Sequence, residues 1–395
     1  MKLRQTYKLG DVINVLDSKR IPLSSKEREM RKGEYPYYGA QGIIDYIDDY
    51  IFDGEYLLIA EDGENLKSQK QNIAQIARGK YWVNNHAHIV ESNGKCDIRY
   101  ICHLLNRMDI SGYITGSAQP KLNQANLCSI EIVLPDLEAQ IRIADFISSF
   151  DSKIEINKRI NDNLEQQAQA LYKSWFIDFE PFKDSKFIDS ELGSIPEGWR
   201  VGKAEDFYEI NIGKTPPRKE HEWFTQDKSQ NIWVSISDLG SDGTFVFDSS
   251  ECLTDKAIQK HNIVLVPENT VLLSFKLTIG RVGIAGTQLT TNEAIARFIT
   301  NRINREYTYF FLKNFNYSKL GSTSSIATAV NSKIIKAMTI LMPSNECLRD
   351  FNRATGTIMD KIKQNEEEVL RLTALRDSLL PKLMSGELKI NDLDC

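Results

Sequence analysis

The sequence predicts an α/β protein in which two globular α/β domains are separated by two long helices, and in which these helices pair as an intramolecular antiparallel coiled coil. Three observations support this fold class. The chain contains a weak internal duplication, two of its stretches have the residue spacing of a coiled coil, and the regions before them contain short β-like runs between turn residues. Such an order predicts pseudo-two-fold symmetry, with two similar ends and a stiff spacer.

The duplication appears as a constant offset of 208 positions. Asn123 lies twelve residues before Pro135, and Asn331 lies twelve residues before Pro343. A weaker match aligns Asn85 with Asn292, which extends the repeat into the globular domains. Further pairs at the offset of 208 are Phe150 with Ile358, Ile154 with Ile362, Asn157 with Asn365, Leu164 with Leu372 and Leu171 with Leu379.

Residues 1–136 are expected to form the first globular domain. Two β-like runs, at residues 56–60 and 87–90, lie among Gly, Asn and Asp residues that favour turns. The first helix is predicted over residues 137–178, because neither Gly nor Pro occurs from 137 to 176 and apolar positions recur at alternating steps of four and three. Forty helical residues would extend for about 60 Å.

The second globular domain is expected over residues 179–343. It opens with a linker rich in turns and aromatics, residues 179–200, and contains β-like runs at 231–236 and 271–275. The second helix is predicted over residues 344–387, where the same spacing returns and Ser385-Gly386 gives a stop signal.

Asn157 and Asn365 each lie near the middle of a predicted helix. Under a pseudo-two-fold antiparallel pairing the two midpoints face one another, and a buried asparagine pair lowers stability but favours a single register. The alternative is that both side chains face solvent. The sequence leaves these two possibilities open.

Composition excludes several classes of protein. The net charge is −5, with 49 basic and 54 acidic residues, which argues against a general polycation that coats nucleic acid. The six cysteines include no C-x-x-C pair, so neither a disulfide framework nor a zinc site is indicated, and a reducing cytoplasm fits. No apolar run reaches membrane-spanning length.

Catalytic motifs are incomplete. Gly213-Lys214-Thr215 resembles the end of a Walker A loop, but Tyr208 occupies the position of its first glycine. Residues 215–218 resemble the motif of amino-methyltransferases but do not match it. His86 and His88 could be two metal ligands on one strand, but no carboxylate or cysteine lies near them in sequence. We therefore expect no catalytic residue, metal site or cofactor in this chain.

Five segments carry a resemblance to a known family. They are residues 35–42, 116–123, 171–182, 190–199 and 379–388, with sequences such as LYKSWFIDFEPF and SELGSIPEGW. With these segments the chain resembles, over essentially its whole length, the specificity subunit of type I restriction-modification enzymes. One departure is that the first domain starts directly at residues 7–11, without the Ile-Pro-x-x-Trp segment of the second.

The resemblance implies that residues 1–136 and 179–343 are target recognition domains, each recognising one half of a split double-stranded DNA sequence. The helices would set the unread spacer and dock two methylation subunits, which use S-adenosylmethionine, while restriction subunits use ATP and Mg. The chain itself would be a non-catalytic, cytoplasmic DNA-binding subunit without membrane contact.

Recognition would then depend on polar side chains in the domain loops, because Arg and Lys suit guanine, Asn and Gln suit adenine, and basic or hydroxyl groups hold phosphates. In the first domain we select Lys19, Arg20, Tyr38, Asp62, Asn65, Asn85, His86, Ser117, Gln119 and Lys121. In the second we select Lys214, Thr215, Arg218, Lys276, Thr278, Arg281, Asn292, Ser324, Ser325 and Lys333.

Two other functions stay open at this point. The first is a coiled-coil scaffold whose end domains bind proteins and never DNA. The second is a methyltransferase with divergent motifs. DNA binding by the chain separates the scaffold from the recognition subunit, and binding of S-adenosylmethionine by the chain alone would favour the methyltransferase.

Overall fold

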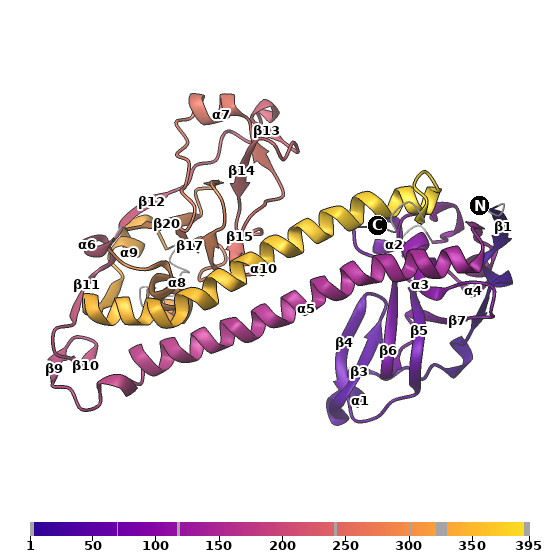
Figure 1. Cartoon of the computed structure of the whole chain (residues 1–395), viewed down its shortest axis with the longest axis horizontal. Helices are drawn as coiled ribbons and strands as arrows, with labels where there is room; N and C mark the ends of the chain where they lie inside the picture. Colours follow the sequence, from indigo (N-terminus) through magenta and orange to yellow (C-terminus); the bar gives the residue numbers. More distant parts are fainter. Residues whose placement is uncertain are drawn as a thin grey trace. The chain divides into compact units, whose positions relative to one another are not determined.

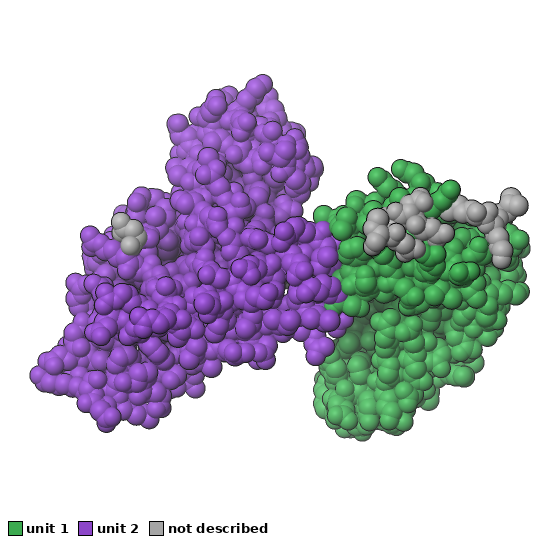
Figure 2. Space-filling model, in the orientation of Figure 1, with its two compact units in different colours: residues 1–152, 374–395 green, residues 153–373 purple. Residues whose placement is uncertain are grey.

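The computed structural model describes residues 4–68, 70–116, 119–240, 243–300, 302–320 and 330–390. The chain forms two compact units, coloured separately in Figure 2. Unit 1 comprises residues 1–152 and 374–395, and unit 2 comprises residues 153–373. The division falls inside both long helices, so each unit contains one globular domain and a stretch of each helix.

Unit 1 is built on a six-stranded sheet of order β2-β7-β5-β6-β3-β4, in which only β3 and β6 pair in parallel. A separate two-stranded sheet joins β1 to β8. The strands are β1 (Gln5–Lys8), β2 (Ile13–Val15), β3 (Lys32–Gly39), β4 (Gly42–Ile47), β5 (Phe52–Ala60), β6 (Ala74–Val83), β7 (Ala87–Ser92) and β8 (Glu131–Leu134). The short helices are α1 (Ser25–Met30), α2 (Asn65–Ser68), α3 (Ile98–Leu105) and α4 (Gln124–Ser129).

A bend in the β5–β6 pair brings its far end back over the sheet. Gly54 and Gly79 lie opposite each other, and both have positive φ, at 141° and 78°. On the two sides of Gly54, Phe52 and Leu58 belong to the same buried cluster. Because the β5–β6 pair bends, three residues are enough to link the end of β6 to the start of β7, which lies on the other side of β5.

The long helices are part of the core of unit 1. Ile143 and Ile147 from α5 (Leu137–Phe176), and Leu380 and Leu383 from α10 (Asn345–Ser385), are buried in one cluster with sheet residues such as Leu57. Burial of each such side chain contributes about 1.5–3 kcal/mol relative to exposure. The amphipathic stripe seen in the sequence therefore serves both helix pairing and attachment to the domain.

Unit 2 has a five-stranded sheet of order β12-β20-β17-β18-β15 and a four-stranded sheet of order β13-β16-β14-β19. Two-stranded sheets join β9 to β10 and β11 to β21. The strands are β9 (Phe187–Ser190), β10 (Gly193–Pro196), β11 (Arg200–Lys203), β12 (Glu209–Ile212), β13 (Phe224–Thr225), β14 (Asn231–Val234), β15 (Phe245–Val246), β16 (Cys252–Leu253), β17 (Val271–Ser274), β18 (Val282–Ala285), β19 (Thr290–Thr291), β20 (Ile295–Ile299) and β21 (Thr339–Met342). The short helices are α6 (Ala204–Phe207), α7 (Asp255–Lys260), α8 (Arg305–Asn314) and α9 (Ser332–Lys336).

The five-stranded sheet repeats the topology of unit 1. The run β12-β20-β17-β18 pairs antiparallel throughout, as β2-β7-β5-β6 does. The parallel pair of β14 with β19 at Thr290 lies at the offset of 208 from the parallel pair of β3 with β6 at Trp82. The sequence duplication is therefore a duplication of fold. Three-residue links after β6 and after β19 occupy equivalent places in the two domains.

The two long helices are α5 (Leu137–Phe176) and α10 (Asn345–Ser385). Asp136 caps α5 by accepting from the backbone N–H of Ala139 at 3.0 Å, and α10 ends before Gly386, whose φ is 81°. Their stretches within unit 2 lie side by side in antiparallel order (Figure 1). No described helix has an apolar stretch long enough to cross a membrane.

Polar contacts in unit 2 show how the helices are aligned. Asn157 and Asn365 are 1% and 2% exposed, so neither faces solvent. Under the pseudo-two-fold pairing the two asparagines would contact each other, but they do not. Asn157 donates to Glu368 and Asn365 donates to Asn161, each at 2.8 Å. Helical side chains lean toward the N-terminus of their own helix, so opposed midpoints of antiparallel helices lean apart. Each asparagine thus reaches a residue beyond the midpoint of the facing helix.

The aromatic segment after α5 completes the core of unit 2. Phe176 contacts Phe351 with ring centroids 4.8 Å apart, and Phe182 contacts Trp199 at 5.1 Å. Within the expected linker, β9 and β10 form a hairpin. Part of the family-like sequence therefore packs the end of one helix against the start of the other.

Candidate nucleic-acid interface

Four loops of unit 1 and the end of β3 meet and form what we call the unit 1 loop cluster, residues 17–20, 38–39, 61–63, 84–86 and 119–122. Backbone hydrogen bonds join them. The N–H of Glu61 donates to the carbonyl of His86 at 2.9 Å, and the N–H of Leu122 donates to the carbonyl of Glu61 at 2.8 Å. The N–H of Asn84 donates to the carbonyl of Tyr38 at 3.0 Å. Most residues selected in the first domain are thus brought together from distant parts of the sequence.

Arg20 holds this cluster together, and its guanidinium is already occupied. It pairs with Glu61 at 2.7 Å and Asp17 at 3.2 Å, and donates to the carbonyl of Ala87 at 2.9 Å. Burial would raise the pKa of Glu61, but Arg20, His88 and Lys121 lower it on balance. The selection of Arg20 as a DNA contact stays a prediction, although its donors bind partners within the protein.

His88 is buried beside this pair. Its Nε2 lies 2.7 Å from the carbonyl oxygen of Leu122, and its Nδ1 lies 2.5 Å from a carboxylate oxygen of Asp17. Burial would raise the pKa of Asp17, but its hydrogen bonds to His88 and Ile89 lower it on balance, so it is ionised. Because a carbonyl oxygen can only accept, the Nε2 of His88 carries a proton.

The same residues offer a possible ligand set for a metal ion. Ligand atoms of Asp17, Glu61 and His88 lie within 4.8 Å of one another. However, Arg20 pairs with both carboxylates, and the Nε2 of His88 is bound to the carbonyl of Leu122. His86 is turned to Asp62 at 2.7 Å and does not join this group. The geometry therefore fits an ion-pair network better than a metal centre, although sequence reasoning missed the carboxylates near His88.

Several selected residues of unit 1 keep exposed side chains. Asp62 is half-buried beside His86, and Tyr38 packs edge-on against Tyr81 with ring centroids 5.3 Å apart. Lys121 pairs with Glu61 at 3.2 Å while remaining half-exposed. The exposed members are Lys19, Asn85, His86, Gln119 and Lys121.

Asn65 and Ser117 are also not part of this exposed set. Asn65 is buried and exchanges hydrogen bonds with the backbone of Gln71 at 2.7 and 2.9 Å, so its amide stabilises a loop and is not free to recognise a base. Ser117 lies outside the described residues.

Four loops form the corresponding unit 2 loop cluster, residues 213–218, 235–240, 275–281 and 292–294. The N–H of Phe275 donates to the carbonyl of Ala294 at 3.0 Å, and the N–H of Lys214 donates to the carbonyl of Thr291 at 2.9 Å. Arg281 donates to the carbonyl of Ile236 at 2.8 Å. These bonds hold the loops around the ends of β14, β17 and β19.

The structural counterpart of Asn292 is Asn84 and not Asn85. The side-chain oxygen of Asn84 accepts from the N–H of His86 at 2.8 Å, and that of Asn292 accepts from the N–H of Ala294 at 3.0 Å. The sequence alignment was therefore wrong by one residue here. The corrected offset is 208, the same as in the helices, and both asparagines stabilise a turn.

Some selected side chains of unit 2 already bind partners within the protein, and others are exposed. Arg218 lies over the rings of Phe224 at 4.4 Å and Trp233 at 4.5 Å, and pairs with Glu251 at 2.7 Å. Lys214 donates to two backbone carbonyls, and the hydroxyl of Thr215 bonds Glu293. Lys276, Thr278 and Lys333 are exposed, and Ser324 and Ser325 lie outside the described residues.

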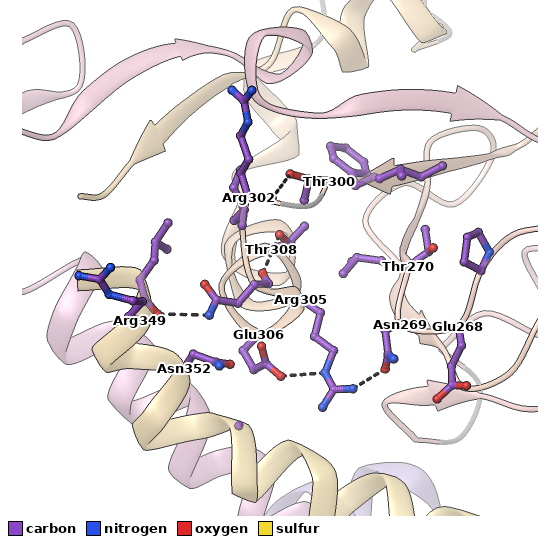
Figure 3. A pocket seen from close by; sticks show the side chains of 18 of the residues that line it. Glu268, Asn269, Thr270, Thr300, Arg302, Arg305, Glu306, Thr308, Arg349 and Asn352 are labelled. Carbon is purple, nitrogen blue, oxygen red and sulfur yellow. Dashed lines mark hydrogen bonds and ion pairs between the residues drawn. The ribbon is translucent and has the colours of Figure 1, made fainter. Parts of the chain in front are cut away.

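A hollow of ≈ 1120 Å³ lies elsewhere in unit 2 (Figure 3). Arg305 pairs with Glu306 at 2.7 Å and bonds Asn269 and Asp360, while Arg302 extends away from these contacts. Burial would lower the pKa of Arg305, but the two acidic groups raise it on balance. The guanidinium of Arg305 is therefore held by partners within the protein.

Comparison with known proteins gives a consistent result. The family model described as "Type I restriction modification DNA specificity domain" matches residues 1–166 and 196–369. The type I restriction enzyme MjaIX specificity subunit of Methanocaldococcus jannaschii is 28% identical, over 94% of this chain and 90% of the relative. The HindI specificity subunit of Haemophilus influenzae is 24% identical, over 96% and 93%. The crystal structure of a type I S subunit from M. genitalium has the same fold, with a TM-score of 0.63, 14% identity and 96% coverage of both chains.

Proposed function

The chain belongs to the type I restriction-modification DNA specificity family, and from that premise we propose that each of its two globular domains recognises one half of a split double-stranded DNA target. The chain is a sequence-specific DNA-recognition subunit and not itself an enzyme. What the proposal adds is the assignment of one half-site to each domain, the spacer set by the helices, and the docking of other subunits.

One observation carries the proposal. The two domains share one strand order and one pair of turn-forming asparagines, Asn84 and Asn292, yet they place different polar residues around those turns. Unit 1 presents Asn85 and His86 where unit 2 presents Glu293. Two domains that recognise different base sequences require different loop surfaces on a common scaffold. Side chains recognise the base edges, whereas contacts to the DNA backbone only position the domain.

The long helices support the docking of partners. Ile156 and Ile160 lie one turn apart on α5 and are 50% and 40% exposed, although the seam of the same helix is buried. Apolar side chains at this spacing suit a partner helix. We propose that two methylation subunits dock on the helices and supply S-adenosylmethionine, that restriction subunits supply ATP and Mg, and that this chain holds no cofactor.

The test is selection of duplexes from a random library, with and without methylation subunits. The chain alone should bind weakly, because its 54 acidic residues outnumber its 49 basic ones and phosphate neutralisation supplies most non-specific affinity. The assembled complex should enrich two short motifs at a fixed separation. Replacing Asn85 and His86 by alanine should relax one motif and leave the other unchanged.

Controls separate DNA recognition from assembly. Ile156→Asn should weaken capture of the methylation subunit and its enhancement of DNA binding without changing the enriched motifs. Failure of the complex to enrich any motif would contradict the proposal and would favour a protein scaffold. Tight, specific binding by the isolated chain at physiological salt would contradict the role given to the methylation subunits.

A further inference from the structure

The loop between β17 and β18 presents a leucine to solvent at the centre of the unit 2 loop cluster. Leu277 is 98% exposed, whereas Phe275, two residues earlier, is buried. The φ of Leu277 is 59°, in the left-handed region that a side chain with a Cβ rarely adopts. An apolar side chain held outward in a conformation of raised energy is a candidate for a functional contact.

Ser274 makes this loop rigid. Its hydroxyl donates to the carbonyl of Thr278 at 2.6 Å and accepts from the N–H of Arg281 at 3.0 Å. Its backbone carbonyl accepts from the N–H of Gly280 at 3.0 Å. The side chain of Arg281 ties the loop to the carbonyl of Ile236. Leu277 is therefore held at the tip of a closed, braced turn.

The chemistry around Leu277 fits a nucleic-acid surface. Lys276 and Thr278 on either side are exposed, and amino and hydroxyl groups are suited to phosphates. Ile279, two residues further on, adds a partly exposed apolar side chain to the same tip. DNA-binding proteins insert leucine, isoleucine or similar side chains between base pairs, where they unstack a step and kink the duplex.

We propose that Leu277 is a wedge that enters a base-pair step of the half-site recognised by unit 2, while Lys276 and Thr278 hold the flanking phosphates. This inference rests on the proposed function and adds a mechanism of recognition to it. Because pyrimidine–purine steps unstack most easily, the wedge would favour such a step at its point of insertion and contribute sequence preference without a hydrogen bond to a base.

The experiment uses the chain assembled with methylation subunits and a duplex carrying the sequence that this complex selects. 2-Aminopurine replaces each adenine in turn, and its fluorescence reports unstacking. The wild-type complex should raise fluorescence beside one step of the unit 2 half-site, and end-to-end energy transfer should report a kink of about 20–90°. Leu277→Asn should abolish both signals, and Leu277→Met should retain them.

The variants are matched to the backbone. Asparagine and glycine both accept a positive φ, so Leu277→Asn and Leu277→Gly should fold with an unchanged or raised thermal midpoint. Leu192→Asn replaces another exposed leucine of unit 2 and should leave both signals intact. An adenine flipped by a methylation subunit would give a signal that does not depend on residue 277.

The outcomes distinguish the two proposals. If the wild-type complex selects a split sequence but Leu277→Asn and Leu277→Gly keep the full fluorescence and bending signals, the wedge is wrong and the proposed function stands. The wedge is equally wrong if Leu192→Asn removes the signals as completely as Leu277→Asn. If the wild-type complex selects no sequence, the proposed function fails first, and the wedge fails with it.

Discussion

Asn365 donates its side-chain amide to the side-chain oxygen of Asn161 at 2.8 Å, across the two long helices of unit 2. Asn161 in turn donates to the backbone carbonyl of Ile362 at 3.2 Å, so the two amides form a small buried network. Polar groups in an otherwise apolar seam are satisfied only when the helices are aligned in this way. The pair therefore favours one alignment of α5 against α10.

Replacing only one asparagine of this pair should destabilise the protein. Asn365→Leu leaves the buried side-chain oxygen of Asn161 without its donor, which costs about 1–3 kcal/mol in the free energy of unfolding. The double variant Asn161→Leu, Asn365→Leu should recover much of that loss. Denaturant unfolding measures both effects. Asn163→Leu, on the exposed face of α5, should change stability by less than about 0.5 kcal/mol, and an equal loss in this control would count against a specific network.

Variants of two neighbouring residues in the unit 1 loop cluster should separate effects on stability from effects on DNA binding. Arg20→Ala removes the partner of two partly buried carboxylates and should lower the free energy of unfolding by about 1–3 kcal/mol. Lys19→Ala removes an exposed charge and should leave stability unchanged while weakening DNA binding and its salt dependence. Thermal unfolding and binding titrations at several salt concentrations give both quantities. The opposite pattern, with Arg20→Ala stable and only DNA binding lost, would indicate that Arg20 contacts DNA directly.

Unfolding should depend on pH through Glu366. Burial raises the pKa of this carboxyl to about 7, against the backbone N–H groups of Thr244 and Phe245 that lower it, and nearby Glu165 raises it further. A raised pKa in the folded state means that the fold binds the proton more tightly than the unfolded chain, whose ordinary value is 4.5. The associated stability is present below about pH 4.5 and is lost as the pH rises to about 7, by on the order of 1–3 kcal/mol.

The pH effect is measured as the difference between the wild type and Glu366→Gln in denaturant midpoints from pH 4.5 to 8. The wild type should lose stability relative to this variant as the pH rises, because glutamine does not titrate. Glu367→Gln, one residue along the same helix, should keep the wild-type dependence. Parallel pH curves for the wild type and Glu366→Gln would show that Glu366 does not titrate in this range.

Exchange of one domain should change one half-site. If residues 1–136 are replaced by the equivalent domain of a relative, the complex should enrich a new motif at one position and keep the second motif and the spacer. Selection from a random library shows all three at once. A chimera in which both motifs changed would refute independent recognition by the two domains.

Lengthening both helices should lengthen the spacer. One heptad inserted after Ser152 and one after Leu372 keeps the contacts of Asn157 with Glu368 and of Asp151 with Arg376, since each pair lies wholly on one side of the insertions. Each helix grows by about 10 Å, or about three base pairs of B-DNA. The preferred spacer should grow by that amount, although the added rotation about the duplex weakens binding.

Insertion in one helix alone is the control for the spacer prediction. A heptad after Ser152 only should misalign α5 against α10 and lower the thermal midpoint. If the doubly lengthened protein kept the original spacer, the helices would not set the distance between half-sites.

The sequence by itself determined the duplication and the two long helices, because both depend on local spacing. Apolar residues at steps of three and four commit a segment to a helix wherever it lies, and the stop at Ser385-Gly386 is a property of neighbouring residues. The sequence also shows which polar residues the loops contain. For these features no distant contact had to be known.

Only the tertiary structure decided which polar groups are free. Arg20 and Glu61 are 41 positions apart, and no local pattern indicates that their ion pair occupies the guanidinium. Asn65 has the amide of a loop residue but is buried by its own turn, and Leu277 is apolar but exposed. Asn365 meets Asn161 and not Asn157, because side chains on antiparallel helices lean in opposite directions. Exposure and pairing depend on residues brought together by folding, which sequence spacing does not encode.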